Sequence, residues 1–216
     1  MKRCIISLLM SLLVVLGNAA LALAGPPLTN TEGVGGVALN PFAYVANPIG
    51  EGETGLGGSD IVSKPNVGFW HISLPDTDLN WNTAGINLSL FNRLELGFSH
   101  ESVDIEAVGG VDKNNLSAKV NLIAEGEFGL SLMPAISVGI IHKTTDCKDF
   151  TADTEKVDYY VVASMTLKDL PVPTVLSAGV LSTKGYVRGV LGFGDDRDEA
   201  FFCNIDMIPM KNIIVG

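Results

Sequence analysis

Residues 80–101 read NWNTAGINLSLFNRLELGFSHE, and the order of apolar and polar residues in this stretch decides the fold. The even-numbered set is Ala84, Ile86, Leu88 and Leu90, and the odd-numbered set is Thr83, Gly85, Asn87 and Ser89. A period of two places successive side chains on opposite faces of a β-strand. The alternation resumes after residues 91–93, so the stretch predicts an antiparallel hairpin with one apolar and one polar face.

The same alternation recurs along the rest of the chain. It is found in residues 116–122, 135–140, 160–167, 176–180 and 201–207. No convincing amphipathic helix interrupts the series. The pattern therefore predicts an all-β protein, with an antiparallel up-and-down sheet over residues 65–216.

Alternation alone fits both a β-sandwich and a transmembrane β-barrel, so strand length and connections must decide. Many runs reach about 9 to 11 residues, which a tilted strand needs to cross a bilayer, whereas globular strands mostly have about 5 or 6. Short connections at 91–93, 168–173 and 209–212 alternate with longer polar ones at 103–115, 144–156 and 183–199. Outer-membrane barrels are connected in this way. The prediction is a transmembrane barrel, with a soluble periplasmic sandwich as the alternative.

Several aromatic residues lie near the ends of the predicted strands. They are Trp70, Trp81, Phe91, Phe98, Tyr159 and Phe201. Together they favour an interfacial aromatic girdle, with ordinary core packing as the alternative for each.

If the apolar face meets lipid, the polar face points into the barrel. The candidate lumen-facing residues are Glu95, Glu101, Lys119, Asn121, Asn204 and Asp206. Many of their neighbours along the strands are Gly, Ser or Ala. Small and polar positions favour a narrow hydrated interior or a hydrogen-bonded polar plug over a close-packed apolar core.

The first 24 residues have the organisation of a secretory signal peptide. Lys2 and Arg3 precede an apolar run over residues 5–16, and Ala22-Leu23-Ala24 supplies the small residues that a signal peptidase recognises. Cleavage before Gly25 is expected. A retained membrane helix is the alternative, because the apolar stretch approaches the roughly 20 residues that a spanning helix needs. Export predicts a location in the outer membrane, or in the periplasm for a soluble sandwich.

Removal of the leader lowers the formal charge from -10 to -12, because Lys2 and Arg3 leave with it. This charge disfavours nucleic acid and anionic membrane surfaces as partners. Outer-membrane lipid is the partner that a barrel requires, and small solutes or envelope proteins are further candidates. The sequence does not indicate an oligomeric state. Cys147 and Cys203 remain after cleavage, and the exported context permits a disulfide between them without requiring it.

Two segments flank the regular pattern. Residues 25–64 are rich in glycine, and Pro41 and Pro48 interrupt the apolar stretch 37–46. We expect an irregular segment that lies in the periplasm or enters the lumen, with an extra strand over 37–46 as the alternative. Residues 213–216 resemble the start of one more strand, whereas single-chain bacterial barrels have an even number of strands. The pattern therefore predicts a barrel that is incomplete at its C-terminal end.

Three motifs carry a family resemblance. They are Glu32-Gly33-Val34-Gly35-Gly36, Ser73-Leu74-Pro75-Asp76 and Phe91-Asn92-Arg93-Leu94-Glu95-Leu96-Gly97. Over residues 31–216 the chain resembles porin-like β-barrel proteins of the Gram-negative envelope, a group that includes a domain-of-unknown-function family. The resemblance implies a fold and a location, and it transfers no functional residue.

The sequence offers little chemistry. His71, His100 and His142 are the only histidines, and no HExxH, CxxC or Gly-x-Ser-x-Gly pattern accompanies them. We therefore predict no catalytic, cofactor or metal site, and no enzyme. A lipid hydrolase on the outer face is a minor alternative. His100 and His142 lie near strand ends at positions that share the apolar, lipid-facing side of their strands. The acidic run at 195–199 is interpreted as a solvated loop rather than a calcium site.

Two functions of different class fit these predictions. The first is a small outer-membrane channel or transport component, which the polar inward residues favour. The second is a structural or binding protein of the envelope, whose acidic outer loops meet partners.

Overall fold

The computed structural model describes residues 28–74, 79–105, 109–147, 155–185, 194, 196–210 and 213–216. The predicted signal peptide, residues 1–24, lies outside these residues. Among the residues described, no helix is long and apolar enough to cross a membrane.

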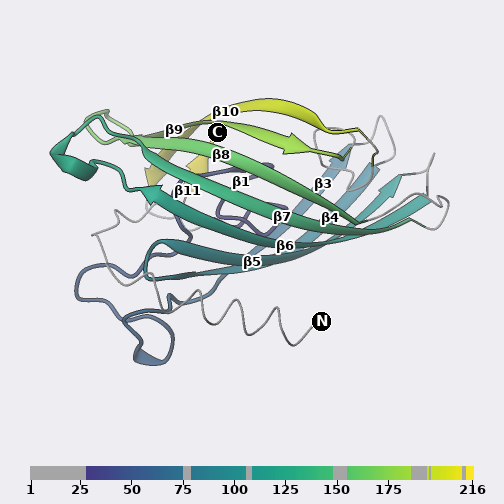
Figure 1. Ribbon diagram of the computed structural model, residues 1–216, viewed down its shortest axis with the longest axis horizontal. Helices are drawn as coiled ribbons and strands as arrows, with labels where there is room; N and C mark the ends of the chain where they lie inside the picture. Colours follow the sequence, from purple (N-terminus) through teal and green to yellow (C-terminus); the bar gives the residue numbers. More distant parts are fainter. Residues whose placement is uncertain are drawn as a thin grey trace.

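Nine strands form one antiparallel sheet, in which each strand pairs with its neighbours in the sequence (Figure 1). They are β3 (Asn66–Leu74), β4 (Leu79–Leu90), β5 (Leu94–Ile105), β6 (Gly109–Ile123), β7 (Ala135–Cys147), β8 (Glu155–Leu167), β9 (Thr174–Thr183), β10 (Asp198–Met210) and β11 (Ile213–Val215). The sheet curls into a half-barrel that is open at its two edges, β3 and β11. The predicted all-β antiparallel architecture is confirmed, and the open sheet is consistent with an incomplete barrel. The alternative of two stacked sheets is not what the described strands form.

The strands extend beyond the limits that the sequence predicts. β5 continues to Ile105 and β6 begins at Gly109, where a loop over 103–115 was expected. β7 likewise continues to Cys147, and β8 begins at Glu155. The prediction of long loops was wrong here because outward residues near these ends, such as Asp104 and Asn114, are polar, so the apolar alternation ends before the strands do.

The short connection between β4 and β5 is confirmed, since Leu90 pairs with Leu94. Phe91 and Asn92 have φ angles of 54° and 53°, in the left-handed region that residues other than glycine seldom adopt. The Asn92 side chain is fixed from outside the hairpin: its Oδ1 accepts from Ile49 N, and its Nδ2 donates to Ile49 O, both at 2.8 Å. The segment before the sheet therefore supports this turn.

The strands present an apolar convex face and a concave face that is charged and polar over one part and apolar over another. Phe69, Leu116 and Phe201 are 78%, 61% and 77% exposed on the convex face, whereas Glu101 and Lys143 are fully buried on the concave face. The apolar side chains of the convex face therefore do not converge on a dry core.

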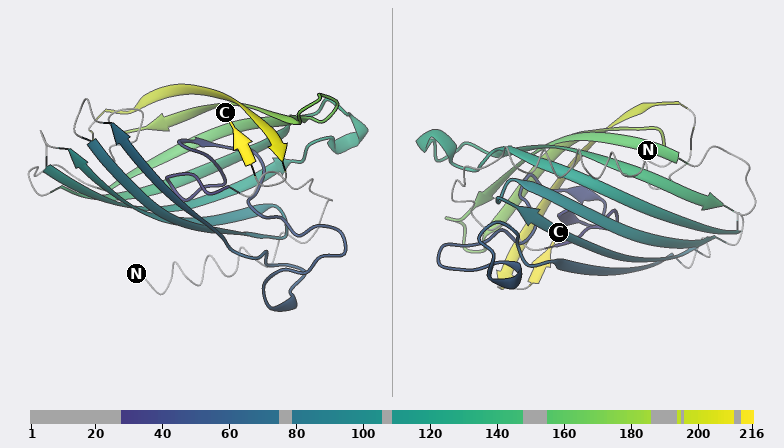
Figure 2. Two further views of the ribbon diagram at one scale, coloured as in Figure 1. Left: turned by 180° about the vertical axis from the view of Figure 1, so that it is seen from behind. Right: turned by 60° about the horizontal axis from the view of Figure 1, so that its bottom comes forward.

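The segment before β3 enters the concavity of the half-barrel (Figure 2). Residues 29–36 and 41–46 are buried, and the turn between them, residues 37–40, is partly or fully exposed. Regular structure is limited to β1 (Gly36–Val37), which pairs with β2 (Asn40–Pro41). The expected irregular segment agrees with this arrangement, and the alternative of an extra strand over 37–46 is wrong. Two short 3-10 helices, η1 (Leu56–Gly58) and η3 (Glu127–Gly129), complete the described regular structure.

The tryptophans do not belong to an outer aromatic girdle. Trp70 Nε1 donates a hydrogen bond of 2.7 Å to Thr29 O, inside the concavity. Trp81 is buried against Val103 and Val111. The girdle prediction was wrong for both, because the hydrophobic pattern near the strand ends does not fix which face an aromatic residue occupies.

Cys203 is free and exposed on the convex face of β10, so it forms no disulfide with Cys147. Cys147 ends β7 rather than lying in a loop, and β8 and β9 separate the two strands.

Candidate functional site

The concave face and the segment inside it form the candidate functional site. Of the six residues that the sequence selects as lumen-facing, Glu95, Glu101, Lys119, Asn121 and Asp206 are buried and Asn204 is partly buried. The structure brings Glu95, Lys119 and Asn121 together around the buried segment. Asn204 and Asp206 lie apart on β10, where they hydrogen-bond to each other.

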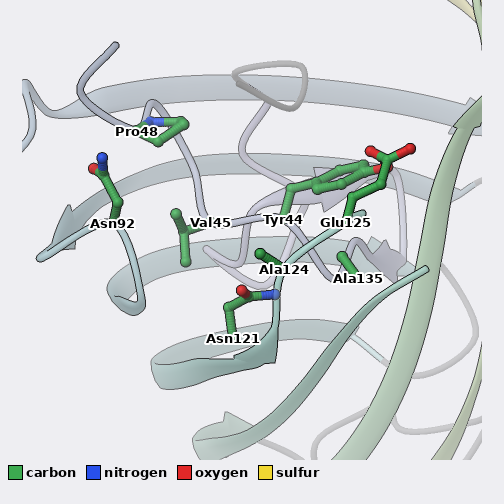
Figure 3. Close-up of a pocket in the computed structure, with 8 residues that line it drawn as sticks. All are labelled: Tyr44, Val45, Pro48, Asn92, Asn121, Ala124, Glu125 and Ala135. Atoms are coloured by element: carbon green, nitrogen blue, oxygen red, sulfur yellow. The ribbon is translucent and has the colours of Figure 1, made fainter. Parts of the chain in front are cut away.

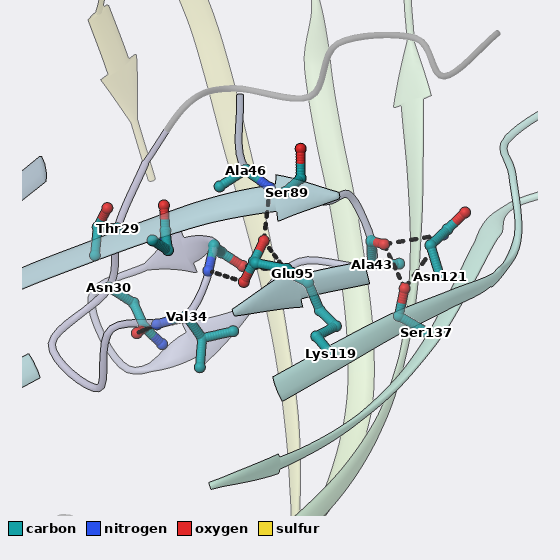
Figure 4. A network of polar contacts seen from close by, with 12 residues as sticks. Thr29, Asn30, Val34, Ala43, Ala46, Ser89, Glu95, Lys119, Asn121 and Ser137 are labelled. Carbon is teal, nitrogen blue, oxygen red and sulfur yellow. Dashed lines mark hydrogen bonds and ion pairs between the residues drawn. The ribbon is translucent and has the colours of Figure 1, made fainter. Parts of the chain in front are cut away.

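Glu95 on β5 binds the segment at two points. Its Oε1 accepts from Gly35 N at 2.7 Å, and its Oε2 accepts from Ala46 N at 2.6 Å (Figure 4). Lys119 on β6, the cross-strand partner of Glu95, forms an ion pair with Oε2 at 3.0 Å and donates to Gly35 O at 3.0 Å. A Cβ on Gly35 would lie 2.5 Å from Glu95 Oε2, so glycine permits this close approach. We call these contacts the Glu95 clasp.

The backbone of Ala43 is held by three strands. Asn121 Nδ2 and Ser137 Oγ both donate to Ala43 O, at 3.0 and 2.5 Å. Ala43 N donates to Ser164 Oγ at 2.8 Å. Buried polar groups are costly unless they are hydrogen-bonded. These side chains supply the hydrogen-bond partners that the buried backbone of Ala43 needs.

A second charged cluster lies on the β5 to β8 part of the concave face. Lys143 Nζ lies 2.5 Å from Glu32 Oε1 and 2.6 Å from Asp158 Oδ2. Lys113 Nζ lies 2.9 Å from Glu101 Oε1 and 4.0 Å from Glu32 Oε1. We call these five residues the lysine cluster. Glu32 comes from the segment, so the cluster also attaches it to the sheet.

Sequence reasoning missed four members of the lysine cluster: Glu32, Lys113, Lys143 and Asp158. Lys113 fell in a region predicted to be a loop, and Glu32 fell in the irregular segment. The odd-even alternation along β6 could have identified Lys113. Lys113 and Lys119 are an even number of residues apart on this strand, so they face the same side of the sheet.

The other half of the concavity is apolar. Phe42 and Tyr44 pack edge to face, with ring centroids 6.4 Å apart, in a core that includes Tyr160, Val162 and Phe202. We call Phe42 and Tyr44 the aromatic anchor.

The Tyr44 hydroxyl lies at one end of the segment. It donates to Glu125 Oε2 at 2.8 Å and lies 2.8 Å from Thr166 Oγ1. Burial raises the pKa of Tyr44 well above its usual range, so the phenol stays neutral. Beside it lies a crevice of about 10 Å³, lined by residues that include Pro48, Asn92 and Glu125 (Figure 3). That volume accommodates about one water molecule.

The three histidines lie away from this interior, on the convex face. His71 Nδ1 contacts Asn82 Oδ1 at 2.8 Å, and His100 Nδ1 contacts Asn114 Oδ1 at 3.0 Å. His142 Nε2 lies 2.8 Å from Glu155 Oε1. Within the described ranges, no group of three or more His, Cys, Asp or Glu residues could hold a metal ion. Part of the acidic run at 195–199 lies outside these ranges.

A family comparison places the chain among related sequences. Residues 25–213 match the family model described as protein of unknown function (DUF3034). The chain belongs to the DUF3034 family. No curated protein and no solved structure matches it. Membership in DUF3034 agrees with the expected domain-of-unknown-function family, and it brings no named activity to the site.

Proposed function

We propose that this DUF3034 protein is embedded in the outer membrane and acts as a transport component whose polar interior is closed by residues 29–46. The observation that carries the proposal is the distribution of apolar residues on the convex face. Outward positions between the strand ends are apolar on β4 to β10, and polar residues follow at the end opposite the short turns. Such a band between polar rims is typical of barrels in lipid.

The edge of this band follows a regular stagger. The last apolar outward residues on β3 to β7 are Phe69, Ala84, Phe98, Leu116 and Ile140. Ala84 pairs with His100 rather than Phe98, and Leu116 pairs with His142 rather than Ile140. The edge therefore shifts by about one residue per strand. A stagger of one residue per strand corresponds to a strand tilt of about 36° in an eight-stranded barrel, so the edge would lie perpendicular to the barrel axis. A membrane surface requires this geometry.

The closed interior supports a gated component rather than a permanently open pore. The Glu95 clasp, the lysine cluster and the aromatic anchor all bind residues 29–46 to the concave wall. Solute passage would require these contacts to break. The alternative is a structural or binding protein of the envelope, in which the segment never leaves.

Location is tested by fractionating cells that express the full chain. We expect the protein in the outer-membrane fraction, with slower gel migration after boiling than before. Recovery in the soluble periplasmic fraction would contradict the membrane proposal.

Transport is tested in planar bilayers with the wild type and the double variant Glu95→Ala/Lys119→Ala. Removing both partners avoids a buried unpaired charge. We expect a closed wild type and frequent openings for the variant, whereas Asp104→Asn, which changes an exposed outward carboxylate, should behave as the wild type. If protease accessibility shows that the segment has been released and the variant still does not conduct, the structural alternative replaces the transport proposal.

A further inference from the structure

A hollow of about 410 Å³ lies on the convex face across β3, β4 and β5. Trp70 and Thr83 contribute to its lining, and its outward-facing lining residues are Phe69, Ala84, His71, Asn82, His100 and Ser102. Phe69 and Ala84 belong to the apolar band, whereas the other four outward-facing residues lie just beyond its edge. In a bilayer, acyl ester groups occupy the depth between the hydrocarbon core and the headgroups. The hollow therefore combines apolar and polar walls at the level where ester groups would lie.

His100 is oriented by a residue of the next strand. Its Nδ1 lies 3.0 Å from Asn114 Oδ1, and the two residues are cross-strand partners. A carboxamide oxygen only accepts hydrogen bonds, so this contact assigns the proton to Nδ1. The lone pair is then on Nε2, which is the form of imidazole that acts as a general base.

Ser102 follows His100 by two residues on the same face of β5, and both line the hollow. Directly opposite Ser102 on β4 is Asn82. Opposed residues in antiparallel strands have Cβ atoms about 4.5 to 5.5 Å apart. The Asn82 Oδ1 is occupied by His71 Nδ1 at 2.8 Å, which leaves the Nδ2 hydrogens as the donors of this side chain.

We infer that Ser102, His100 and Asn82 form an esterase site for acyl-ester lipids, with Asn114 and His71 as positioning residues. A nucleophile, a base, an orienting group and an oxyanion donor are the parts that acyl transfer requires. The inference rests on the proposed function, because the convex face meets lipid only if the sheet is membrane-embedded. It departs from the expectation of no enzyme, since the partners come from three neighbouring strands and form no motif.

The chemistry balances without a metal or redox partner. Ser102 Oγ attacks the acyl carbonyl carbon and transfers its proton to His100 Nε2, while Asn82 Nδ2 donates to the developing oxyanion. The bond to the leaving alcohol breaks, and His100 returns the proton to the alcohol oxygen. Water then attacks the acyl-serine ester, His100 accepts one water proton, and Ser102 leaves with that proton. The products are a fatty acid and an alcohol.

The other two histidines supply internal comparisons. His142 contacts Glu155, and the residue two positions later is Thr144. Ser73 lies two residues after His71, as Ser102 does after His100. Neither Ser73 nor His142 lines the hollow. Variants of Ser73 and His142 therefore test whether reactivity belongs to this hollow or to exposed hydroxyl and imidazole groups in general.

The test uses the full chain in detergent micelles, a fluorophosphonate probe and a phospholipid with a fluorogenic acyl ester. We expect probe attachment at Ser102 and ester turnover in the wild type. Ser102→Ala should abolish labelling and, like His100→Gln, lower turnover by more than about 100-fold. Ser73→Ala and His142→Gln should retain both signals. No labelling of the wild type, or equal turnover in Ser102→Ala, would overturn the esterase site.

Two further measurements distinguish loss of the esterase site from misfolding of the variant and from a wrong membrane location. Heat-modifiable migration of Ser102→Ala checks that the variant folds, and fractionation checks the membrane location independently of esterase activity. Asn114→Ala should lower kcat with little change in KM, and Asn114→Asp, which keeps an acceptor oxygen for His100 Nδ1, should restore much of kcat. An unchanged kcat in Asn114→Ala would remove its positioning role.

Discussion

The two sides of the concavity hold residues 29–46 in different ways. Against β5 to β8 the segment is bound by the Glu95 clasp and the lysine cluster. Against β8 to β10 it is bound by the aromatic anchor, which packs on Val162, Val175 and Phe202. The charged side needs correct partners at every position, whereas the apolar side needs only matched volume.

This difference assigns separate physical roles to the two sides. Burial of apolar area supplies net stabilisation in proportion to area, so the aromatic anchor favours insertion of the segment. Buried ion pairs add little net stability after desolvation, but breaking one by removing a single partner is costly. The charged side therefore restricts the segment to one register rather than driving it into the concavity.

The largest effect is expected from Lys143→Met. The change leaves Glu32 and Asp158 without their shared cation in the buried interior and should lower the free energy of unfolding by about 3 to 5 kcal/mol. Urea unfolding in micelles measures this value. The triple variant Glu32→Gln/Lys143→Met/Asp158→Asn should recover most of the loss, and a triple variant as unstable as Lys143→Met would contradict the ion-pair account.

Phe42→Ala tests the apolar side. Removing this fully buried ring should cost about 3 kcal/mol of unfolding free energy, through lost burial and a residual cavity. Limited proteolysis should then cut within residues 29–46 before it cuts the sheet. Phe42→Leu is the matched control and should protect the segment much better, since it keeps most of the apolar volume. Equal protection in both variants would show that the charged side alone retains the segment.

Gly35→Ala tests the fit of the Glu95 clasp without removing a charge. The added Cβ meets Glu95 Oε2 at 2.5 Å and Lys119 Nζ at 3.1 Å, so we expect a loss of about 2 kcal/mol by overpacking. Thermal unfolding is the measurement. Gly110→Ala serves as the control, because its Cβ would have no atom within 4 Å. A Gly35→Ala variant with wild-type stability would mean that the clasp tolerates rearrangement.

The smallest effect concerns a partly buried ion pair outside the concavity, between Arg93 and Glu127. A hydrogen bond from Ala124 N and the guanidinium of Arg93 lower the pKa of Glu127. A carboxyl whose pKa is lowered on folding contributes stability above its ordinary pKa, and the contribution is lost as pH falls through the lowered value. Glu127→Gln should lower the free energy of unfolding slightly at neutral pH, where the wild-type carboxylate contributes, and should differ little from the wild type in acid, so its stability depends less on pH. If the stability difference between the two proteins is the same at acid and neutral pH, the ionisation of Glu127 does not contribute.

The hairpin of β4 and β5 was predictable because its apolar positions alternate without a break from residue 84 to residue 98, on both sides of a short turn. The outer ends of β5 and β6 were not, since polar residues on both faces remove the hydrophobic period there. Glu95 and Lys119 were selected by parity alone. Their common ligand, the backbone of Gly35, lies 60 and 84 residues away in the sequence, a distance that no local pattern bridges.

The amino-acid sequence by itself determined the sheet and its two faces, because a period of two is a local property of each strand. Tertiary structure alone decided that residues 29–46 fill the concavity and that Lys143 meets Glu32 and Asp158. It also decided that Asn82, Ser102, His100 and Asn114 adjoin across β4, β5 and β6. The physical reason is register: pairing between strands fixes which distant side chains meet, and no single strand carries that information.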